Sequence, residues 1–123
     1  MNAVKIEFGV PNKGWLELTI SNQNQRITLN ISDAPCDSIN ELAKTIVNLQ
    51  SGSKIEEVEF SLEPDFALWR FISFEDELQI HVFSNAIRDR PVIFKDNRKK
   101  LLNRIYQALK DLEKYHAVNT LII

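Results

Sequence analysis

The chain has 123 residues, 44% hydrophobic and 26% charged, and this composition is typical of a globular domain rather than a disordered chain. No apolar run approaches the roughly 18 residues that a membrane-spanning helix needs, so we expect no membrane association. The formal net charge of −2 excludes a uniformly basic nucleic-acid-binding protein. A chain of this length predicts one domain, covering residues 1–123.

The amino-terminal residues MNAVKIEFGV lack a basic segment followed by an apolar core, so we expect no secretory signal. Cys36 is the one cysteine in the sequence, and it can form neither an internal disulfide nor a cysteine metal cluster. These features predict a cytoplasmic protein.

Apolar and polar residues alternate in three segments near the amino terminus, at residues 4–10, 15–20 and 26–31. This period is characteristic of strands with one buried face. Short polar turns separate the segments, and the first of them contains Pro11 and Gly14. We therefore predict an antiparallel meander of three strands.

A helix is predicted next, over about Ser38–Gln50, because apolar residues recur there at helical spacing. Ser38 and Glu41 match a capping box, and Asp37 adds negative charge near the amino end of the helix dipole. Gly52 is a natural stop, because it adopts a left-handed conformation at little cost.

Three further strands are predicted between residues 56 and 83, the segment richest in aromatic side chains. Residues 66–74 are largely apolar at both parities, which predicts a central strand covered on both faces. Arg70 lies in the middle of that strand and must be exposed or paired. Trp69 is expected in the core, whereas Trp15 lies at a polar position of its strand and is expected to be more exposed.

The segment before the last helix fits either a short strand or a loop at residues 91–94. From Asp96 or Asn97, apolar residues at three- and four-residue steps predict a helix that reaches His116. Its first turn is basic, which opposes the helix dipole and indicates internal pairing or an acidic partner. The apolar tail, residues 118–123, is expected to pack against the domain. The predicted fold is therefore α+β, with about six strands in one antiparallel sheet, the order βββ-α-βββ-α, and both helices packed on one face.

Charged residues are segregated along the sequence. Residues 54–77 contain eight acidic and two basic residues, whereas residues 88–104 contain seven basic and two acidic residues. These blocks predict an acidic side and a basic side, unless they pair with each other within the fold.

No catalytic constellation is recognisable. The three glycines are isolated from one another, so a phosphate-binding loop is absent. His81 and His116 lie 35 positions apart and have no metal-ligand spacing, so both are expected to be structural or surface residues. Cys36 precedes a helix, but no base is in view that would activate its thiol. We predict no enzyme activity, no metal and no cofactor.

Two short patterns resemble a known group of proteins. One is the run Gly14–Ile20 followed by a helix, and the other is Glu63-Pro64 followed, after four intervening residues, by Trp69. They are similar to small single-domain bacterial proteins of uncharacterised families, some of which resemble immunity proteins of polymorphic-toxin and contact-dependent inhibition systems. The resemblance covers about residues 14–83 and implies a protein that neutralises a cognate toxin by binding it, without catalysis. Immunity proteins share no common binding motif, so the resemblance assigns no functional residue.

Two functions remain as hypotheses. The first is binding of a protein, such as a toxin domain, through an acidic surface with an aromatic anchor. Its candidate residues are Glu56, Glu57, Glu59, Glu63, Asp65, Glu75, Asp76, Glu77 and Trp15. The alternative is binding of nucleic acid or a phosphate ligand by a basic segment, against which stands a pI near 5.7. Its candidate residues are Arg88, Arg90, Lys95, Arg98, Lys99, Lys100 and Arg104. The sequence leaves the oligomeric state and the edge strands open.

Overall fold

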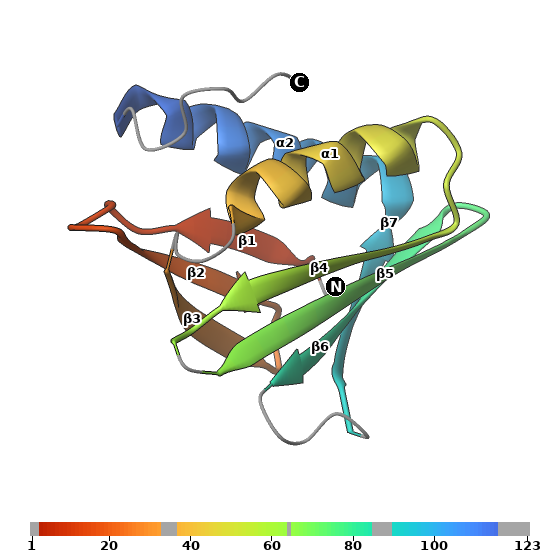
Figure 1. The fold of residues 1–123 in the computed structure, drawn as a ribbon. Coiled ribbons are helices and arrows are strands. Elements are labelled where there is room, and N and C mark those ends of the chain that lie inside the picture. Colours follow the sequence, from red (N-terminus) through yellow and green to blue (C-terminus); the bar gives the residue numbers. More distant parts are fainter. Residues whose placement is uncertain (1–2, 33–36, 64, 85–89, 116–123) are drawn as a thin grey trace.

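The computed structural model describes residues 3–32, 37–63, 65–84 and 90–115. Their elements follow one another along the chain as shown in Figure 1. In order, they are β1 (Lys5–Phe8), β2 (Trp15–Ser21), β3 (Arg26–Ser32), α1 (Ser38–Gln50), β4 (Ile55–Ser61), β5 (Phe66–Phe74), β6 (Glu77–Ser84), β7 (Val92–Asn97), α2 (Arg98–Leu112) and the 3-10 turn η1 (Glu113–Tyr115).

The strands form two antiparallel sheets, with the orders β1-β2-β3 and β4-β5-β6-β7. The α+β class and the antiparallel meander are thereby confirmed, and residues 92–94 of the uncertain segment belong to the strand β7 rather than to a loop. The prediction of one six-stranded sheet is wrong. Alternation shows which face of a strand is buried, but it does not show whether strands on either side of a helix pair. Here β3 pairs with β2, and β4 begins a second sheet with β5.

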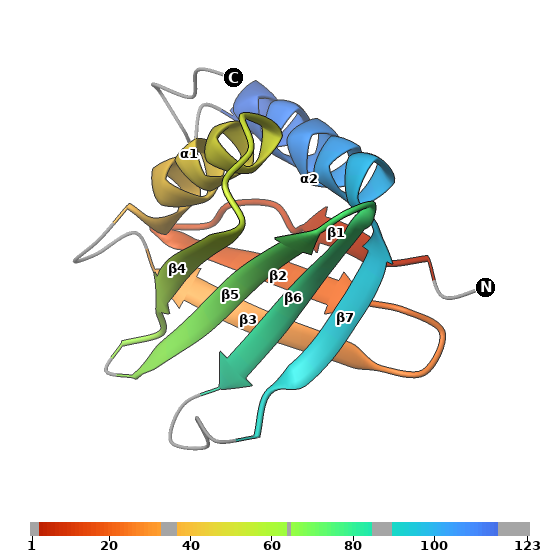
Figure 2. The same ribbon diagram turned by 90° about the vertical axis from the view of Figure 1, so that its right-hand side faces the viewer.

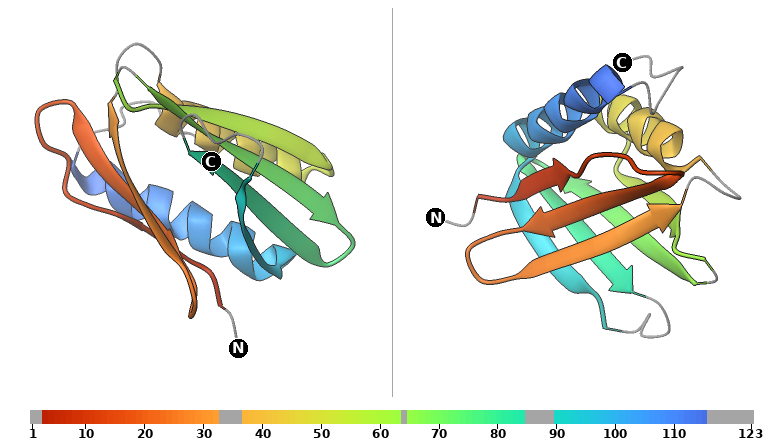
Figure 3. Two further views of the ribbon diagram at one scale, coloured as in Figure 1. Left: turned by 90° about the horizontal axis from the view of Figure 1, so that it is seen from below. Right: turned by 90° about the vertical axis from the view of Figure 1, so that its left-hand side faces the viewer.

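The two sheets face each other, and the strands of one cross those of the other (Figure 2). Both helices lie side by side over the same end of the two sheets, as Figures 1 and 3 show. The predicted packing of helices on one face of a single sheet is therefore replaced by helices that close one end of a two-layer structure.

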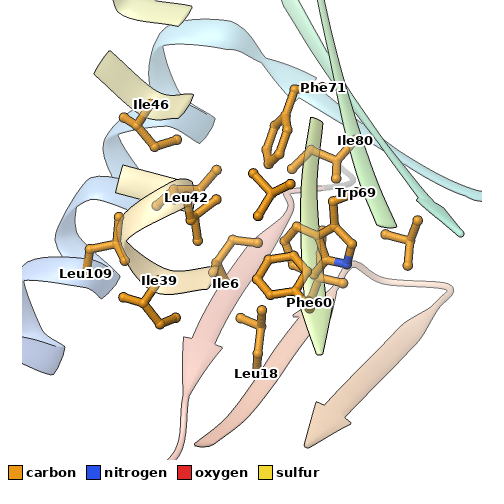
Figure 4. Close-up of a cluster of buried hydrophobic side chains, with 14 of the residues drawn as sticks. Ile6, Leu18, Ile39, Leu42, Ile46, Phe60, Trp69, Phe71, Ile80 and Leu109 are labelled. Carbon is orange, nitrogen blue, oxygen red and sulfur yellow. The ribbon is translucent and has the colours of Figure 1, made fainter. Parts of the chain in front are cut away.

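The core lies between the two sheets and beneath the helices. Figure 4 shows side chains from both sheets and both helices in one cluster, including Leu18 of β2, Leu42 of α1 and Leu109 of α2. Trp69 of β5 is fully buried, as predicted, and its ring lies 5.1 Å from that of Phe60 in an edge-to-face arrangement. Burial of such large rings is a major contribution to the stability of the fold.

The first helix has the predicted bounds but a different cap. Asp37 is the N-cap residue, and its side chain accepts a hydrogen bond from the backbone N–H of Asn40. Ser38 is instead the first helical residue, and its hydroxyl donates to the carbonyl of Glu59 at 2.9 Å. The N-cap is thus Asp37 rather than the predicted Ser38, whose hydroxyl ties the helix to β4 instead. Gly52 follows the helix with a φ of +110°, as a left-handed stop requires.

The second helix begins directly after β7. The side chain of Asn97 caps it by accepting from the N–H of Lys100 at 3.0 Å. Just before the cap, Asp96 accepts from the N–H of Val4 at 2.9 Å and from Arg104 Nη1 at 2.6 Å. Arg104 also donates to the carbonyl of Val4 at 3.1 Å. These bonds hold the start of the first sheet against α2. The predicted helical position of His116 and the packing of the tail lie outside the described residues.

Candidate protein-binding surface

The four-stranded sheet has an inner face in the core and an opposite face, here called the outer face. Antiparallel pairing places alternate residues of the four strands on the outer face in aligned rows. The outer face comprises Ile55, Glu57 and Glu59 of β4, Phe66, Leu68, Arg70, Ile72 and Phe74 of β5, Glu77, Gln79, His81 and Phe83 of β6, and Ile93, Lys95 and Asn97 of β7. None of the described elements lies over this face, which is turned towards the viewer in Figure 2.

Apolar side chains occupy much of the outer face. Ile55 is 62% exposed, Phe74 66% and Ile93 44%, while Leu68 and Ile72 are half-buried. The sequence predicted that β5 would be covered on both faces, but the described part of the chain covers only one. The apolar residues at both parities of β5 were the signal for this surface. Several exposed apolar side chains gathered on one face of a sheet are characteristic of an interaction site.

Arg70 lies at the centre of the outer face and is paired there. Its Nε donates to Glu57 Oε2 at 2.6 Å, and its guanidinium lies 5.0 Å from the centre of the Phe83 ring. Phe83 is only 8% exposed but does not belong to the core cluster, because it lies on the outer side of the sheet. Both charged side chains remain partly exposed, so the ion pair contributes little stability. It does compensate the charge of Arg70 within the chain.

His81 stands beside Arg70 on the neighbouring strand. Its Nε2 lies 2.9 Å from Gln79 Oε1. Burial lowers the pKa of His81 below its usual 6.5, and the nearby guanidinium of Arg70 lowers it further. The imidazole is therefore neutral at pH 7, as expected of a residue in a structural or surface role.

The acidic residues do not form one continuous patch. Glu57 and Glu59 are exposed on the outer face of β4, and Glu77 lies at the start of β6, where it accepts from Gln79 Nε2 at 2.7 Å. Glu56 has the opposite parity on β4 and points elsewhere. It accepts hydrogen bonds from Ser53 Oγ at 2.5 Å and from Asn48 Nδ2 at 3.2 Å, which join β4 to the end of α1.

The remaining acidic residues lie in turns at opposite ends of β5. Glu63 follows β4, accepts from the hydroxyl of Ser32 and links the two sheets, with Asp65 exposed beside it. Glu75 and Asp76 are exposed in the turn between β5 and β6. The nine-residue strand β5 separates the two turns, so these four residues cannot act as one site with Glu57.

Trp15 lies at the start of β2 and is 37% exposed. It pairs with Ser32 in the three-stranded sheet, on the side that faces away from the core. Trp15 is therefore more exposed than Trp69, as predicted, but it belongs to a different sheet from the outer face.

The basic residues are also distributed over several places. Arg104 is held by Asp96, and Arg98 Nε donates to the carbonyl of Glu75 at 3.1 Å. Lys99 and Lys100 are exposed on the first turn of α2. Lys95 lies on the outer face, Arg90 is exposed just before β7, and Arg88 lies outside the described residues.

The amino end of α2 has few donors left for a phosphate. The N–H of Arg98 donates to the carbonyl of Asp76 at 2.6 Å, and that of Lys100 donates to the side chain of Asn97. Acidic and basic segments thus do meet within the fold, chiefly where α2 begins beside the turn that contains Glu75 and Asp76.

The pKa of the Asp96 carboxyl group is lowered from its usual value. Burial raises the pKa of Asp96, but hydrogen bonds from the N–H of Val4, from Arg104 and from the N–H of Asn97 lower it by more. The net result is a pKa below 3.8, which indicates a structural ion pair rather than a proton-transferring group.

No candidate metal centre is found among the described residues. Groups of three or more His, Cys, Asp or Glu side chains that could hold a metal are absent from them, and Cys36 lies outside the described ranges. A groove of about 510 Å³ runs between β1 and α2, but its charged lining, including Lys5, Lys100 and Asp111, contains no nucleophile with a neighbouring base. Neither of the two helices described is long and apolar enough to cross a membrane.

No family model, curated protein or solved structure matches this chain.

Proposed function

We propose that this chain is a non-catalytic protein-binding domain and that the outer face of the β4–β7 sheet is its docking surface. The observation that carries the proposal is the number of exposed and half-buried apolar side chains gathered on that face. Ile55 and Phe74 are each exposed by more than half, and Ile93 by nearly half. Single exposed apolar residues are common, but residues spread over four adjacent strands form the kind of surface that partners bury.

The surface has the composition of a protein interface. Apolar residues such as Leu68 and Ile72 lie on the middle strands beside the Arg70–Glu57 ion pair, and the exposed charged residues Glu59 and Lys95 lie on the two edge strands. A partner would gain affinity from burying the centre and specificity from matching the charged rim. The exposed carboxylate of Glu59 on β4, beside the Arg70–Glu57 ion pair, favours a partner that presents a basic side chain next to an apolar patch.

A toxin domain is one partner of this kind. The resemblance of residues 14–83 to immunity proteins supports this more specific proposal, in which the bound domain occludes the toxin and performs no chemistry itself. The expected cytoplasmic location is part of the same proposal.

Affinity capture with tagged protein from the source cells tests the proposed function. Phe74→Asp and Ile93→Asp place charges at exposed positions of the outer face, so folding should be retained. Asn30→Asp on the exposed side of β3 is the matched control. We expect a stoichiometric protein partner that is lost with both outer-face variants and kept with the control. A partner that still binds both outer-face variants would show that the docking surface lies elsewhere.

The alternative function, nucleic-acid or phosphate binding, has weaker support. Lys99 and Lys100 are exposed, but Arg104 is paired, and backbone donors at the start of α2 are already used. Oligonucleotide binding that falls steeply with salt and is lost in Lys99→Glu with Lys100→Glu would favour this alternative over the outer face.

A further inference from the structure

The strand β1 lies at one edge of the three-stranded sheet, and β2 is its one partner among the described strands. The N–H of Gly9 donates to the carbonyl of Glu17 at 2.9 Å, which makes these two residues a hydrogen-bonded pair. Such pairs alternate along an antiparallel ladder, so the N–H and C=O groups of Ile6 and Phe8 point away from β2. The free edge of β1 therefore presents two donors and two acceptors at the spacing of a strand.

These four backbone groups receive no hydrogen bond from the described residues. Val4, two positions before Ile6, shows what the edge requires. Its N–H donates to Asp96 at 2.9 Å and its carbonyl accepts from Arg104 at 3.1 Å, so two side chains take the place of a neighbouring strand there. Ile6 is only 7% exposed, so water has little access to its backbone. Buried N–H and C=O groups are almost always paired in folded proteins, and those of Ile6 therefore call for a partner.

A groove follows the free edge of β1, between this strand and α2. Two hollows of about 510 Å³ and 260 Å³ adjoin there, because both are lined by Ile6, Glu7, Ala108 and Asp111. The first hollow reaches Arg104, at the end of the edge that is already satisfied, and the second reaches Tyr115. The groove therefore runs beside the unpaired backbone groups and leads to the last of the described residues.

We propose that this groove binds an extended segment and that residues 117–123 of this chain occupy it as a fourth strand, antiparallel to β1. The backbone of the added strand pairs with that of Ile6 and Phe8, as in β-augmentation. The inference is independent of the proposed function, because the outer face belongs to the other sheet. Edge strands are commonly covered in this way, which prevents them from pairing with other chains.

The direction of α2 selects this segment. Arg104, in the middle of the helix, bonds the carbonyl of Val4, and Leu112, at its end, lines the groove with Phe8. The helix therefore runs parallel to β1, and the chain leaves it beside the carboxyl end of that strand. A chain that reverses after Tyr115 passes back along the free edge, which gives the antiparallel orientation.

The composition and length of the segment suit the free edge. Residues 118–123 are Val-Asn-Thr-Leu-Ile-Ile, and four of these six are β-branched residues, which favour strands. The four residues of β1 span roughly 13 Å at about 3.3 Å per residue. The eight residues after Tyr115 supply about three for the reversal and about five for pairing. Attachment to the same chain gives the segment an effective concentration on the order of 1 mM, which favours it over a segment of another protein.

Amide hydrogen exchange of the full chain, followed by NMR, tests the added strand. The N–H groups of Lys5 and Glu7 pair with β2 and should be protected in any case. The N–H groups of Ile6 and Phe8 should also exchange at least about 100-fold more slowly than unprotected amides, because the added strand accepts from them. The Hα of Glu7 should show a nuclear Overhauser contact with a residue in 118–122, since it then lies in a closely spaced, non-hydrogen-bonded pair.

Two adjacent proline variants test the hydrogen bonds of the added strand. Successive N–H groups of a strand point to opposite sides, so one of Thr120→Pro and Leu121→Pro removes a bond to β1 and the other removes none. We expect one variant to speed exchange at Ile6 and Phe8 by about tenfold or more. The other should leave exchange nearly unchanged, which makes it the matched control. Amides of β2 report that the first sheet is still folded in both variants.

Three outcomes contradict the fourth strand. Fast exchange at Ile6 and Phe8 in the wild type would overturn the inference, because the edge would then be unoccupied. Protection without contacts to residues 118–122, or protection that increases with protein concentration, would also overturn it, since another segment or a second copy would then cover the edge. Equal effects of the two proline variants would show that the segment does not join the sheet.

Discussion

Trp69 combines complete burial with an unpaired polar atom. Its indole Nε1 has no hydrogen-bond partner within the described residues. A buried donor without a partner costs about 1–3 kcal/mol, whereas the surrounding rings stabilise the same side chain by packing. The aromatic ring at this position, rather than the N–H group, is therefore what the core requires.

Replacement of Trp69 by Phe should therefore lower the free energy of unfolding by less than the loss of side-chain volume alone suggests. Trp69→Phe removes the unpaired donor and leaves a small cavity, so we expect a change of at most about 1 kcal/mol in the free energy of unfolding. Trp69→Ala should cost about 3–5 kcal/mol. Urea denaturation followed by circular dichroism measures both values. A cost for Trp69→Phe close to that for Trp69→Ala would show that Nε1 contributes a favourable interaction.

Asp96 should make the fold sensitive to acid. Its pKa is lowered in the folded state, so the stabilisation is complete above the unfolded-state value of 3.8 and is lost as the pH falls through the folded-state pKa. Asp96→Asn should lower the free energy of unfolding at neutral pH by about 1.5–3 kcal/mol, because charge-assisted hydrogen bonds to Val4 and Arg104 are weakened. Denaturation at a series of pH values should show the wild type and variant converging in acid.

Asp111→Asn is the matched control for this change. Asp111 is exposed on α2, so its replacement should alter stability by less than about 0.5 kcal/mol at any pH. If Asp96→Asn shows the same decline in acid as the wild type, another group causes the acid sensitivity.

At the scale of elements, the first turn of α2 is basic. The contacts of Arg98 explain its presence there, whereas those of Lys99 do not. Arg98 uses both its backbone N–H and its Nε on the turn at Glu75 and Asp76. Lys99 makes no hydrogen bond or ion pair within the described part of the chain, and its charge opposes the helix dipole.

Reversal of the charge at Lys99 should therefore stabilise the helix. We expect Lys99→Glu to raise the free energy of unfolding by about 0.3–1 kcal/mol, and less at high salt. Asn103→Glu adds an acid at an exposed position in the middle of α2, where the dipole has little effect. Thermal or urea denaturation compares the two variants. An equal gain from Asn103→Glu would attribute the effect to net charge rather than to the dipole.

The helices could be predicted more closely than the sheets, because helix signals are local. The apolar spacing and Gly52 were sufficient to place the bounds of α1, whereas the cap at Asp37 was missed because Ser38 donates to Glu59, a residue 21 positions away. The outer face could be predicted only in part. Apolar residues at both parities of β5 indicated that both faces of this strand are apolar. No sequence pattern showed that the helices would leave its outer face uncovered.

At the scale of the whole molecule, the arrangement of the sheets depends on contacts between distant residues. Gln25 Nε2 donates to the carbonyl of Ile93 at 2.9 Å, and Ser32 donates to Glu63. These bonds connect the two sheets at separate places and join residues whose pairing leaves no periodic signal in the sequence. The candidate acidic residues are likewise spread over strands and turns, because β5 separates the turn with Glu63 and Asp65 from the turn with Glu75 and Asp76.

The shared core predicts that the two sheets unfold together. Leu18 of β2 is fully buried and belongs to the same cluster as Trp69 of β5. Leu18→Ala should therefore cost about 2–5 kcal/mol and should shift the unfolding of the other sheet as well. In a Trp15→Phe background, Trp69 is the remaining tryptophan, and its fluorescence reports on the four-stranded sheet.

We expect the fluorescence and far-UV circular dichroism midpoints to coincide and to fall together in Leu18→Ala, as in a two-state transition. Asn30→Ala, at an exposed position of β3, should move neither midpoint appreciably. If Leu18→Ala lowers the midpoint measured by circular dichroism but not the midpoint measured by Trp69 fluorescence, the four-stranded sheet is stable without the other sheet. The outer face would then belong to a unit that folds independently. Coincident transitions would instead show that the geometry of the outer face depends on both sheets and on the helices that share their core.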